Sequence, residues 1–449
     1  MRWPICSLIL CAGAAFAQVP QTLTLDEAIR IGRENNRGLK MSAAKAEADH
    51  ARASETGALR YASVSLYGAY SRLEEGAFHI SSKTLPIPLS VGNVPPDQYT
   101  VRFGLRQPLF TGSRLSATAD AAALQADASE YDHAMSEADV TLNVTYAYWS
   151  LYQERQMGKF SRENVQRLAS YRSDTERLMK AGAATRNDLL RVEVQLSSAR
   201  INLIEVENDA RIAEMNLNSV LGQPTDTPVQ LSSLPEETGI PSNLERGGAG
   251  DSARSIVGIA VSRRGDLLAA STRVKAAGAS VTAARGGWWP QVELNANFNY
   301  NNPNARYQPI TPEFLGTWDV GVSLSMDLWN WGATQSRVEL AEAALKNARL
   351  QESQLAENIS LEVNRAALNL RKSRQKLSLA QLAVEQADEN LRVVTDKYRA
   401  GLATSTELLD AEVALLQVQT QLSGARVELA LSRAALARAV GGGPGGLAQ

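Results

Sequence analysis

KAGAATRNDLL, residues 180–190, returns later in the chain as RAGLATSTELL, residues 399–409. Gly182 corresponds to Gly401, a shift of 401 − 182 = 219 positions, and the match continues without a gap to the end of each half. An earlier match relates Val64-Ser65-Leu66 to Val292-Glu293-Leu294. An internal repeat of this size determines the architecture before any local motif does. The sequence therefore predicts two copies of one large structural unit.

The N-terminus is typical of an export signal. Arg2 supplies the positive charge, an apolar run follows from Ile5 to Phe16, and Ala15-Phe16-Ala17 fits a cleavage site. We therefore expect residues 1–17 to be removed. Both cysteines, Cys6 and Cys11, lie in this segment, so the mature chain would contain no thiol and no disulfide. Acylation at Cys11 stays open but is disfavoured, because Leu10 precedes it rather than a small residue.

Composition excludes some partners. The chain has 48 acidic and 46 basic residues, so no net field attracts nucleic acid or anionic lipid. After the signal, no apolar stretch reaches the 18 or so residues of a transmembrane helix.

Four segments alternate between apolar and polar residues, as strands with one apolar face do. The two in the second half run from Val292 to Tyr300 and from Asp319 to Leu328, and those in the first half are centred on Leu66 and Phe103. Aromatic residues bracket them: Tyr61, Tyr70, Tyr99, Phe110, Trp288, Trp289, Tyr300, Trp318 and Trp329. Such bracketing favours membrane strands, although a half-buried sheet of a soluble protein shows the same alternation.

Four strands are too few to close a barrel, and an open sheet edge is not tolerated in lipid. The chain is therefore predicted to share one barrel among copies, and three copies would supply twelve strands. The connections at about 73–97 and 301–315 are predicted as loops from their proline and asparagine content.

Very long helices follow the strands. Residues from about 113 to 181 and from about 334 to 400 contain no proline, and a helix of that length extends about 100 Å. Shorter helices are predicted at 187–221 and 406–440, after the glycine turns, and at 25–57 and 252–285. An apolar seam with a period near 3.5 residues indicates lateral helix packing: Ala366, Leu370, Ser373, Leu377, Ala380, Val384, Ala387, Leu391, Val394 and Tyr398.

These elements predict an α+β membrane protein with an internal tandem duplication, in which the strands of a shared β-barrel lie at one end of a wall of long helices. The predicted order is a signal peptide at 1–17, a first repeat at 18–222, a linker at 223–251, a second repeat at 252–441 and a flexible tail at 442–449.

Gln107-Pro108-Leu109-Phe110 before the first long helix and the run from Tyr398 to Thr404 at the second turn complete the pattern. The mature chain resembles the TolC-type outer membrane efflux proteins. The resemblance implies a homotrimer in the outer membrane of a Gram-negative bacterium, in which a trimeric twelve-stranded β-barrel continues into a long α-helical barrel that extends into the periplasm. It also implies a passive exit duct for a tripartite efflux or type I secretion system, without a cofactor. The implied partners are outer membrane lipid, a periplasmic adaptor (membrane fusion) protein and an inner membrane pump of the RND, ABC or MFS type.

The resemblance also assigns residues. Adaptor contacts fall on the two turns: Gly182, Ala183, Thr185, Gly401, Leu402, Ala403 and Thr404. A periplasmic gate falls on Glu407, Asp410, Asp188 and Tyr398, with a bond expected between Tyr398 and Asp188. Carboxylates grouped around a trimer axis are expected to titrate at raised pH. One departure is that the basic gate residue of the best-known member falls on Ala403. A favourable interaction with the helix dipole is the plainer explanation of these carboxylates.

Other function classes have less support. His50, His79 and His133 have no ligand-spaced partners and no nucleophile motif occurs, so an enzyme is not expected. A periplasmic coiled-coil scaffold explains the helices but not the bracketed strands. The cargo, whether drugs, metals or polypeptides, stays open.

Overall fold

The computed structural model of the chain describes residues 22–74, 79–80, 89–90, 95–232, 251–308 and 310–442. The predicted signal peptide and residues 443–449 of the predicted tail lie outside these ranges. The chain divides into two compact units, each built from segments of both sequence halves. Unit 1 comprises residues 1–40, 135–264 and 359–449, and unit 2 comprises residues 41–134 and 265–358.

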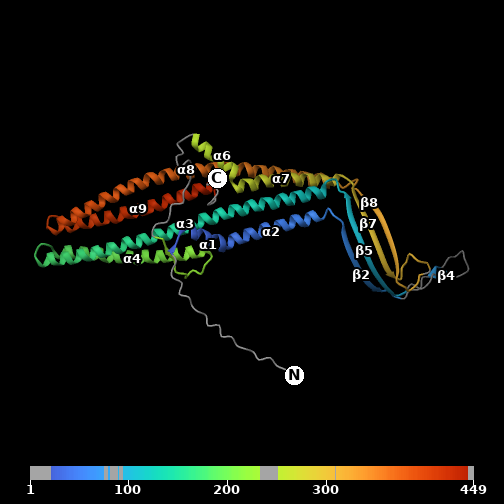
Figure 1. Cartoon of the computed structure of the whole chain (residues 1–449), viewed down its shortest axis with the longest axis horizontal. Coiled ribbons are helices and arrows are strands. Elements are labelled where there is room, and N and C mark those ends of the chain that lie inside the picture. Colours follow the sequence, from blue (N-terminus) through green and yellow to red (C-terminus); the bar gives the residue numbers. More distant parts are fainter. Residues whose placement is uncertain are drawn as a thin grey trace, which may run out of the picture. The chain divides into compact units, whose positions relative to one another are not determined.

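Unit 2 contains the predicted four-stranded sheet, which is antiparallel throughout. The strands in spatial order are β2 (Ser63–Arg72), β5 (Asp97–Phe110), β7 (Gln291–Asn302) and β8 (Leu315–Ser325) (Figure 1). Each repeat supplies one pair of neighbouring strands, and β5 and β7 join the two pairs at the centre.

The fourth strand lies earlier in the sequence than predicted, beginning at Leu315 rather than Asp319 and ending at Ser325 rather than Leu328. β8 ends at Ser325 and does not reach Leu328, because its last pairing partner is Gln291, the first residue of β7. The residue before Gln291 is Pro290, which has no N–H to extend the ladder.

The predicted loop between β2 and β5 contains a further short hairpin. It consists of β3 (His79–Ile80) paired with β4 (Leu89–Ser90). Residues 75–78, 81–88 and 91–94 of this connection lie outside the described ranges.

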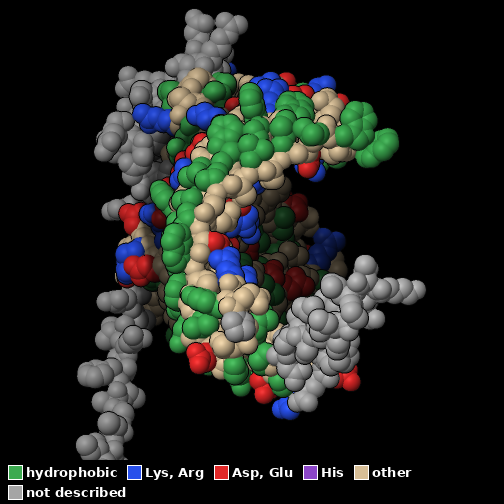
Figure 2. Space-filling model, turned by 90° about the vertical axis from the view of Figure 1, so that its right-hand side faces the viewer, with side chains coloured by type: hydrophobic (Ala, Val, Ile, Leu, Met, Phe, Trp, Pro, Cys, Tyr) green, Lys and Arg blue, Asp and Glu red, His purple; other side chains and the backbone are tan. Residues whose placement is uncertain are grey.

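The two faces of the sheet differ in chemistry. One row across the four strands consists of Leu66, Phe103, Phe298 and Trp318, and the next row consists of Tyr67, Arg102, Asn299 and Thr317. Successive residues of a strand point to opposite faces, so the first row belongs to an apolar face and the second to a polar face. Figure 2 shows hydrophobic side chains along the convex side of the curved sheet and charged ones on its hollow side. The predicted alternation is confirmed.

Each repeat contributes a helix of 67 residues followed by a shorter helix, as predicted. These are α3 (Arg114–Lys180) with α4 (Arg186–Leu221), and α8 (Ala333–Arg399) with α9 (Ser405–Ala439) (Figure 1). All four helices begin and end within about two residues of the predicted positions.

The helices that open the two repeats are each interrupted, whereas the sequence predicts single helices at 25–57 and 252–285. The pieces are α1 (Leu25–Asn35), α2 (Arg37–Ala58), α6 (Asp251–Arg263) and α7 (Gly265–Arg285). At the first break the Asn36 carboxamide accepts a hydrogen bond from the Leu39 N–H at 3.1 Å and donates one to the Val220 carbonyl at 3.3 Å. At the second, the buried Arg264 donates to the Ala439 carbonyl at 3.4 Å. A local cap together with a long-range contact accompanies the first break, and a long-range contact accompanies the second.

The predicted seam lies inside unit 1. All ten of its residues are buried or half-buried, and Ser373 meets Ser432 of α9 through their hydroxyls at 2.9 Å. Toward the turns, the seam joins one apolar core with residues of both hairpins: Leu168, Tyr171, Val192, Leu196, Leu391, Tyr398, Leu408 and Leu415. Lateral packing of both repeats therefore stabilises this part of the unit.

A second core in unit 1 anchors the first repeat. α1 packs on α3 and α4 around Ile29, Val144 and Leu217, and the Tyr148 hydroxyl donates to the Leu23 carbonyl at 3.0 Å. Leu23 belongs to β1 (Thr22–Leu23), which pairs in parallel with β6 (Gln230–Leu231). The predicted linker at 223–251 thus contributes a strand, while its residues 233–250 lie outside the described ranges.

Among the helices in the described ranges, none is both long enough and apolar enough to cross a membrane.

Candidate functional site

The two glycine turns of unit 1 have the same local structure. Gly182 and Gly401 adopt left-handed φ angles of 78° and 74°. Behind each glycine, the last turn of the long helix closes with the same bonds: Ala183 N–H to Leu178 O at 2.9 Å, and Leu402 N–H to Lys397 O at 2.8 Å. This pattern is a Schellman motif, which explains glycine at both positions.

A capping box starts the shorter helix after each turn. The Asp188 N–H donates to Thr185 Oγ1 at 3.2 Å, while the Thr185 N–H donates to Asp188 Oδ2 at 2.9 Å. Thr404 and Glu407 repeat the arrangement at 3.2 and 2.7 Å. Two predicted gate residues, Asp188 and Glu407, therefore serve first as reciprocal caps of α4 and α9.

Asp188 also links the two turns. Its second carboxylate oxygen, Oδ1, accepts a hydrogen bond from the Ser405 hydroxyl at 2.7 Å. One turn further along α4, the Arg191 guanidinium donates to Thr406 Oγ1 at 2.7 Å. Both contacts run from α4 to the first turn of α9. These two contacts join the hairpins close to Ala403, the position at which the resemblance led us to expect a basic residue.

The expected bond between Tyr398 and Asp188 is absent from the structure, which corrects the prediction. The Tyr398 hydroxyl pairs with Thr175 Oγ1 at 2.6 Å, inside the apolar core, and its side chain is buried. The Tyr398 hydroxyl bonds to Thr175 and so connects α8 with α3, whereas the Asp188 carboxylate bonds to Ser405 and so connects α4 with α9.

Within the chain, hydrogen bonds shift the pKa of two of these carboxylates, Asp188 and Glu407, downward. Hydrogen bonds from Thr185 and Ser405 lower the pKa of Asp188, and those from Thr404 lower the pKa of Glu407. Donors aimed at a carboxylate stabilise its charged form. The expectation of a raised pKa rests on repulsion between protomers and remains a prediction for the assembled state.

The lowered pKa of Asp188 gives a pH dependence with a definite sign. Its capping contribution is complete above the ordinary aspartate pKa of about 3.9 and is lost as the pH falls through the lower folded value. We expect Asp188→Asn to cost about 1 kcal/mol at pH 7 and to reduce the loss of stability between pH 7 and pH 3. Thermal unfolding of both proteins at the two pH values measures this. An equal loss of stability in the wild type and in Asp188→Asn would contradict a pH-dependent contribution from the Asp188 cap.

Asp410 is exposed and lines an open groove of about 450 Å³ between α4 and α9. Four pairs of corresponding residues, together with Gln195, line it from both sides: Asn187, Leu190, Arg191, Val194, Gln195, Thr406, Leu409, Asp410 and Val413. The predicted gate residues thus divide between this groove, the caps and the core.

The structure also contains a buried ion pair that the sequence did not reveal. Glu412 of α9 is 2% exposed, and both its carboxylate oxygens accept from Arg167 Nε of α3 at 3.0 Å. Nearby, burial is the main cause that raises the pKa of Tyr171 to about 12. Glu193, the counterpart of Glu412 in the first repeat, pairs with Arg172 at 3.0 Å, but its side chain is 37% exposed. Nothing in the sequence distinguishes the two glutamates.

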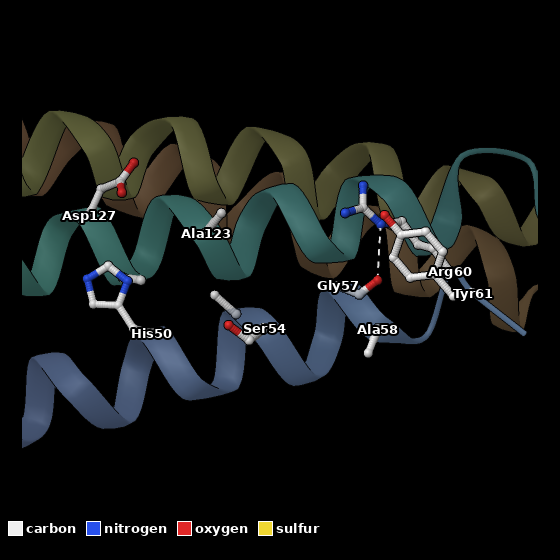
Figure 3. A pocket seen from close by; sticks show the side chains of 10 residues that line it. His50, Ser54, Gly57, Ala58, Arg60, Tyr61, Ala123 and Asp127 are labelled. Carbon is white, nitrogen blue, oxygen red and sulfur yellow. Dashed lines mark hydrogen bonds between the residues drawn. The ribbon is translucent and has the colours of Figure 1, made fainter. Parts of the chain in front are cut away.

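In unit 2, a groove of about 420 Å³ lies between α2 and α3 (Figure 3). His50 projects from α2 on one side and Asp127 from α3 on the other. The His50 Nε2 atom lies 2.7 Å from a Glu130 carboxylate oxygen, and His133 Nδ1 pairs with the Ser42 hydroxyl at 2.8 Å. Among the described residues, no group of three or more His, Cys, Asp or Glu side chains could hold a metal ion.

Comparison with known proteins gives consistent matches. The family model described as "Outer membrane efflux protein" matches residues 28–223 and 256–442. The outer membrane efflux protein BepC of Brucella suis is 23% identical over 360 residues, covering 79% of this chain and 75% of BepC. The outer membrane protein TolC of Vibrio cholerae is 24% identical, covering 72% of each chain.

Among solved structures, the outer membrane protein VceC of Vibrio cholerae aligns with a TM-score of 0.77 at 19% identity. The alignment covers 93% of this chain and 96% of VceC, so it establishes the same fold. For the first curated relatives that match in sequence, the alignments span between 63% and 75% of their own length.

Proposed function

Because this chain belongs to the outer membrane efflux protein family, we propose that it is the outer membrane exit channel of a tripartite efflux or type I secretion system. Transport through it is passive, and an inner membrane pump supplies the energy. The resemblance found in the sequence agrees with the family match, which covers both repeats.

The apolar face of the four-stranded sheet is the observation that carries this proposal. Large apolar side chains on β8 are open in the single chain, with Trp318, Val320 and Leu324 exposed by 73%, 61% and 67%. A monomeric soluble protein rarely exposes such a continuous apolar surface. On the opposite face, Arg106 pairs with Glu293 at 2.6 Å and Asn297 donates to Asp319 at 2.8 Å. The exposed apolar side chains fit a face toward lipid, and the polar pairs fit a face toward an aqueous lumen.

Closure of the sheet requires further copies. In one chain, β2 and β8 are the edge strands of the four-stranded sheet, and unpaired edges are not tolerated in lipid. Pairing β8 of one protomer with β2 of the next would remove both edges. Three protomers would then form the proposed twelve-stranded barrel.

The glycine turns are the proposed contact site for a periplasmic adaptor. Leu402 is 79% exposed at the second turn, and the first turn presents the exposed Ala183 in the corresponding position. Since the two turns share one backbone structure, both can present a similar surface to a partner. The complete proposed contact set is Gly182, Ala183, Thr185, Gly401, Leu402, Ala403 and Thr404.

The same end of unit 1 is the proposed gate. Glu407 and Asp410 would form acidic rings around the trimer axis, while Asp188 and Tyr398 hold the neighbouring helices in place through Ser405 and Thr175. Rings of carboxylates favour cations and repel one another.

A double substitution tests the gate. Glu407→Ala with Asp410→Ala should raise the single-channel conductance and lower the cation preference, because the charged constriction is removed. Conductance and reversal potential in planar bilayers measure both effects. Glu389→Ala with Asp396→Ala is the matched control, since it removes two exposed carboxylates that pair with Arg392 on α8. Unchanged conductance and selectivity in the gate variant would exclude these residues from the constriction.

Location and native mass test the function itself. After gentle detergent extraction from a Gram-negative host, the mature protein is expected in the outer membrane fraction with the mass of a trimer. A periplasmic monomer or dimer would overturn the channel and favour a scaffold built from the helical hairpins.

A further inference from the structure

In unit 1, α4 contacts α9 through a residue whose counterpart on α9 has no equivalent contact within the chain. In the chain, Asp188 of α4 bonds to Ser405 at the start of α9. The shift of 219 maps Asp188 onto Glu407, and maps Ser405 back onto Arg186 at the start of α4. The repeat-related contact would therefore join Glu407 to Arg186, but a single chain cannot make it twice between the same two helices.

The two unmatched residues are both accessible. Glu407 uses only its Oε2 oxygen, for the cap on Thr404, and both Glu407 and Arg186 are exposed, whereas Asp188 is half-buried and Ser405 is buried. Arg186 makes no ion pair or hydrogen bond with any residue in the described ranges. The cap leaves Glu407 Oε1 able to accept a hydrogen bond, as Asp188 Oδ1 accepts one from Ser405.

We propose that Glu407 forms an ion pair with Arg186 of the partner subunit, so that α9 of one protomer packs on the next protomer's α4 as α4 packs on α9 within the chain. The proposal rests on the trimeric channel proposed above. In a ring of three chains, α4 and α9 alternate, so the free face of each α9 meets an α4 of the next copy. A head-to-tail contact that closes into a ring is heterologous, and its two surfaces must be complementary.

Charge and length fit this pairing. An acidic side chain faces a guanidinium, with which a carboxylate forms a strong charge-assisted hydrogen bond. Both side chains are longer than those of Asp188 and Ser405, so the pair can bridge a wider gap than the contact within the chain does. Three such pairs would bind the closed entrance together at the level where Ala403 supplies no cation. In that closed state the ring of Asp410 would supply the negative charge of the constriction, and the ring of Glu407 would add to it once the pairs separate.

Cross-linking distinguishes this contact from the one inside the chain. The sequence has cysteines only at Cys6 and Cys11, in the predicted signal. Arg186→Cys with Glu407→Cys, treated in membranes with a short bifunctional thiol reagent, should give covalent dimers and trimers on denaturing gels. The matched pair, Asp188→Cys with Ser405→Cys, should react within one chain and stay at monomer mass with its thiols consumed. Each single-cysteine variant should remain monomeric.

The possible failures can be separated. A wild-type protein with the native mass of a monomer would overturn both the trimer and this ion pair. A native trimer in which the 188/405 pair cross-links but the 186/407 pair stays monomeric would overturn the ion pair alone. Charge reversal gives a second test: Glu407→Arg and Arg186→Glu should each lower the temperature at which the trimer dissociates, and the double reversal should restore it. Additive losses in the double reversal would exclude direct pairing.

Discussion

Glu412→Gln is expected to lower the free energy of unfolding by about 2–3 kcal/mol, since it leaves the Arg167 guanidinium without its anion. Removing one partner of a fully buried pair costs about 3–5 kcal/mol. The expected value is smaller because the Arg167 side chain is 27% exposed and water can partly solvate it. The Nη2 atom of Arg167 is already buried without a hydrogen-bond partner among the described residues, so the carboxylate is its principal stabilising contact.

The internal repeat supplies a control for this substitution. Glu193→Gln makes the same chemical change 219 positions earlier, on the corresponding helix, in a pair whose side chains are 43% and 37% exposed. Its cost should be about 0–1 kcal/mol. Thermal unfolding of both variants in detergent, followed by circular dichroism, provides the comparison. If both midpoints fall equally, burial of Glu412 does not determine its contribution.

The contrast between Glu412 and Glu193 shows where sequence reasoning stops. The repeat, the four strands and the long helices follow from periodicity and from the positions of glycine and proline, which act locally. Whether a glutamate is buried depends on which helix packs beside it, and the two glutamates occupy the same position in nearly the same motif. Their environments differ because Arg167 lies on α3 and reaches across to the other hairpin, whereas Arg172 reaches α4 of its own hairpin.

Contacts between residues far apart in the chain also contribute to two incorrect predictions, the uninterrupted opening helices and the bond between Tyr398 and Asp188. At Asn36 a local cap on the Leu39 N–H accompanies a bond to the Val220 carbonyl, 184 positions away. At Arg264 the bond to the Ala439 carbonyl spans 175 positions. Tyr398 bonds to Thr175, 223 positions away, and Asp188 bonds to Ser405, 217 positions away. The caps at Thr185 and Thr404, by contrast, involve residues only three positions apart, and a sequence can reveal such pairs.

Val320→Lys should prevent most of the protein from assembling in the outer membrane. Val320 lies at the middle of β8 on the apolar face, opposite Ala296 of β7, and is 61% exposed in the single chain. A lysine facing lipid at the bilayer midplane costs about 2–4 kcal/mol. A trimer carries three copies, so the penalty is applied three times in one barrel.

The next residue along β8 provides the control. Gly321 belongs to the polar face, opposite Asn295, and a side chain added there would meet nothing within 4 Å. Gly321→Lys therefore adds the same charge on the same strand but directs it toward the proposed aqueous lumen. We expect near wild-type assembly, measured as folded trimer in outer membrane fractions and as urea stability in lipid vesicles. Equal losses from the two substitutions would mean that both faces meet the same environment, which a channel with lipid outside and water inside does not allow.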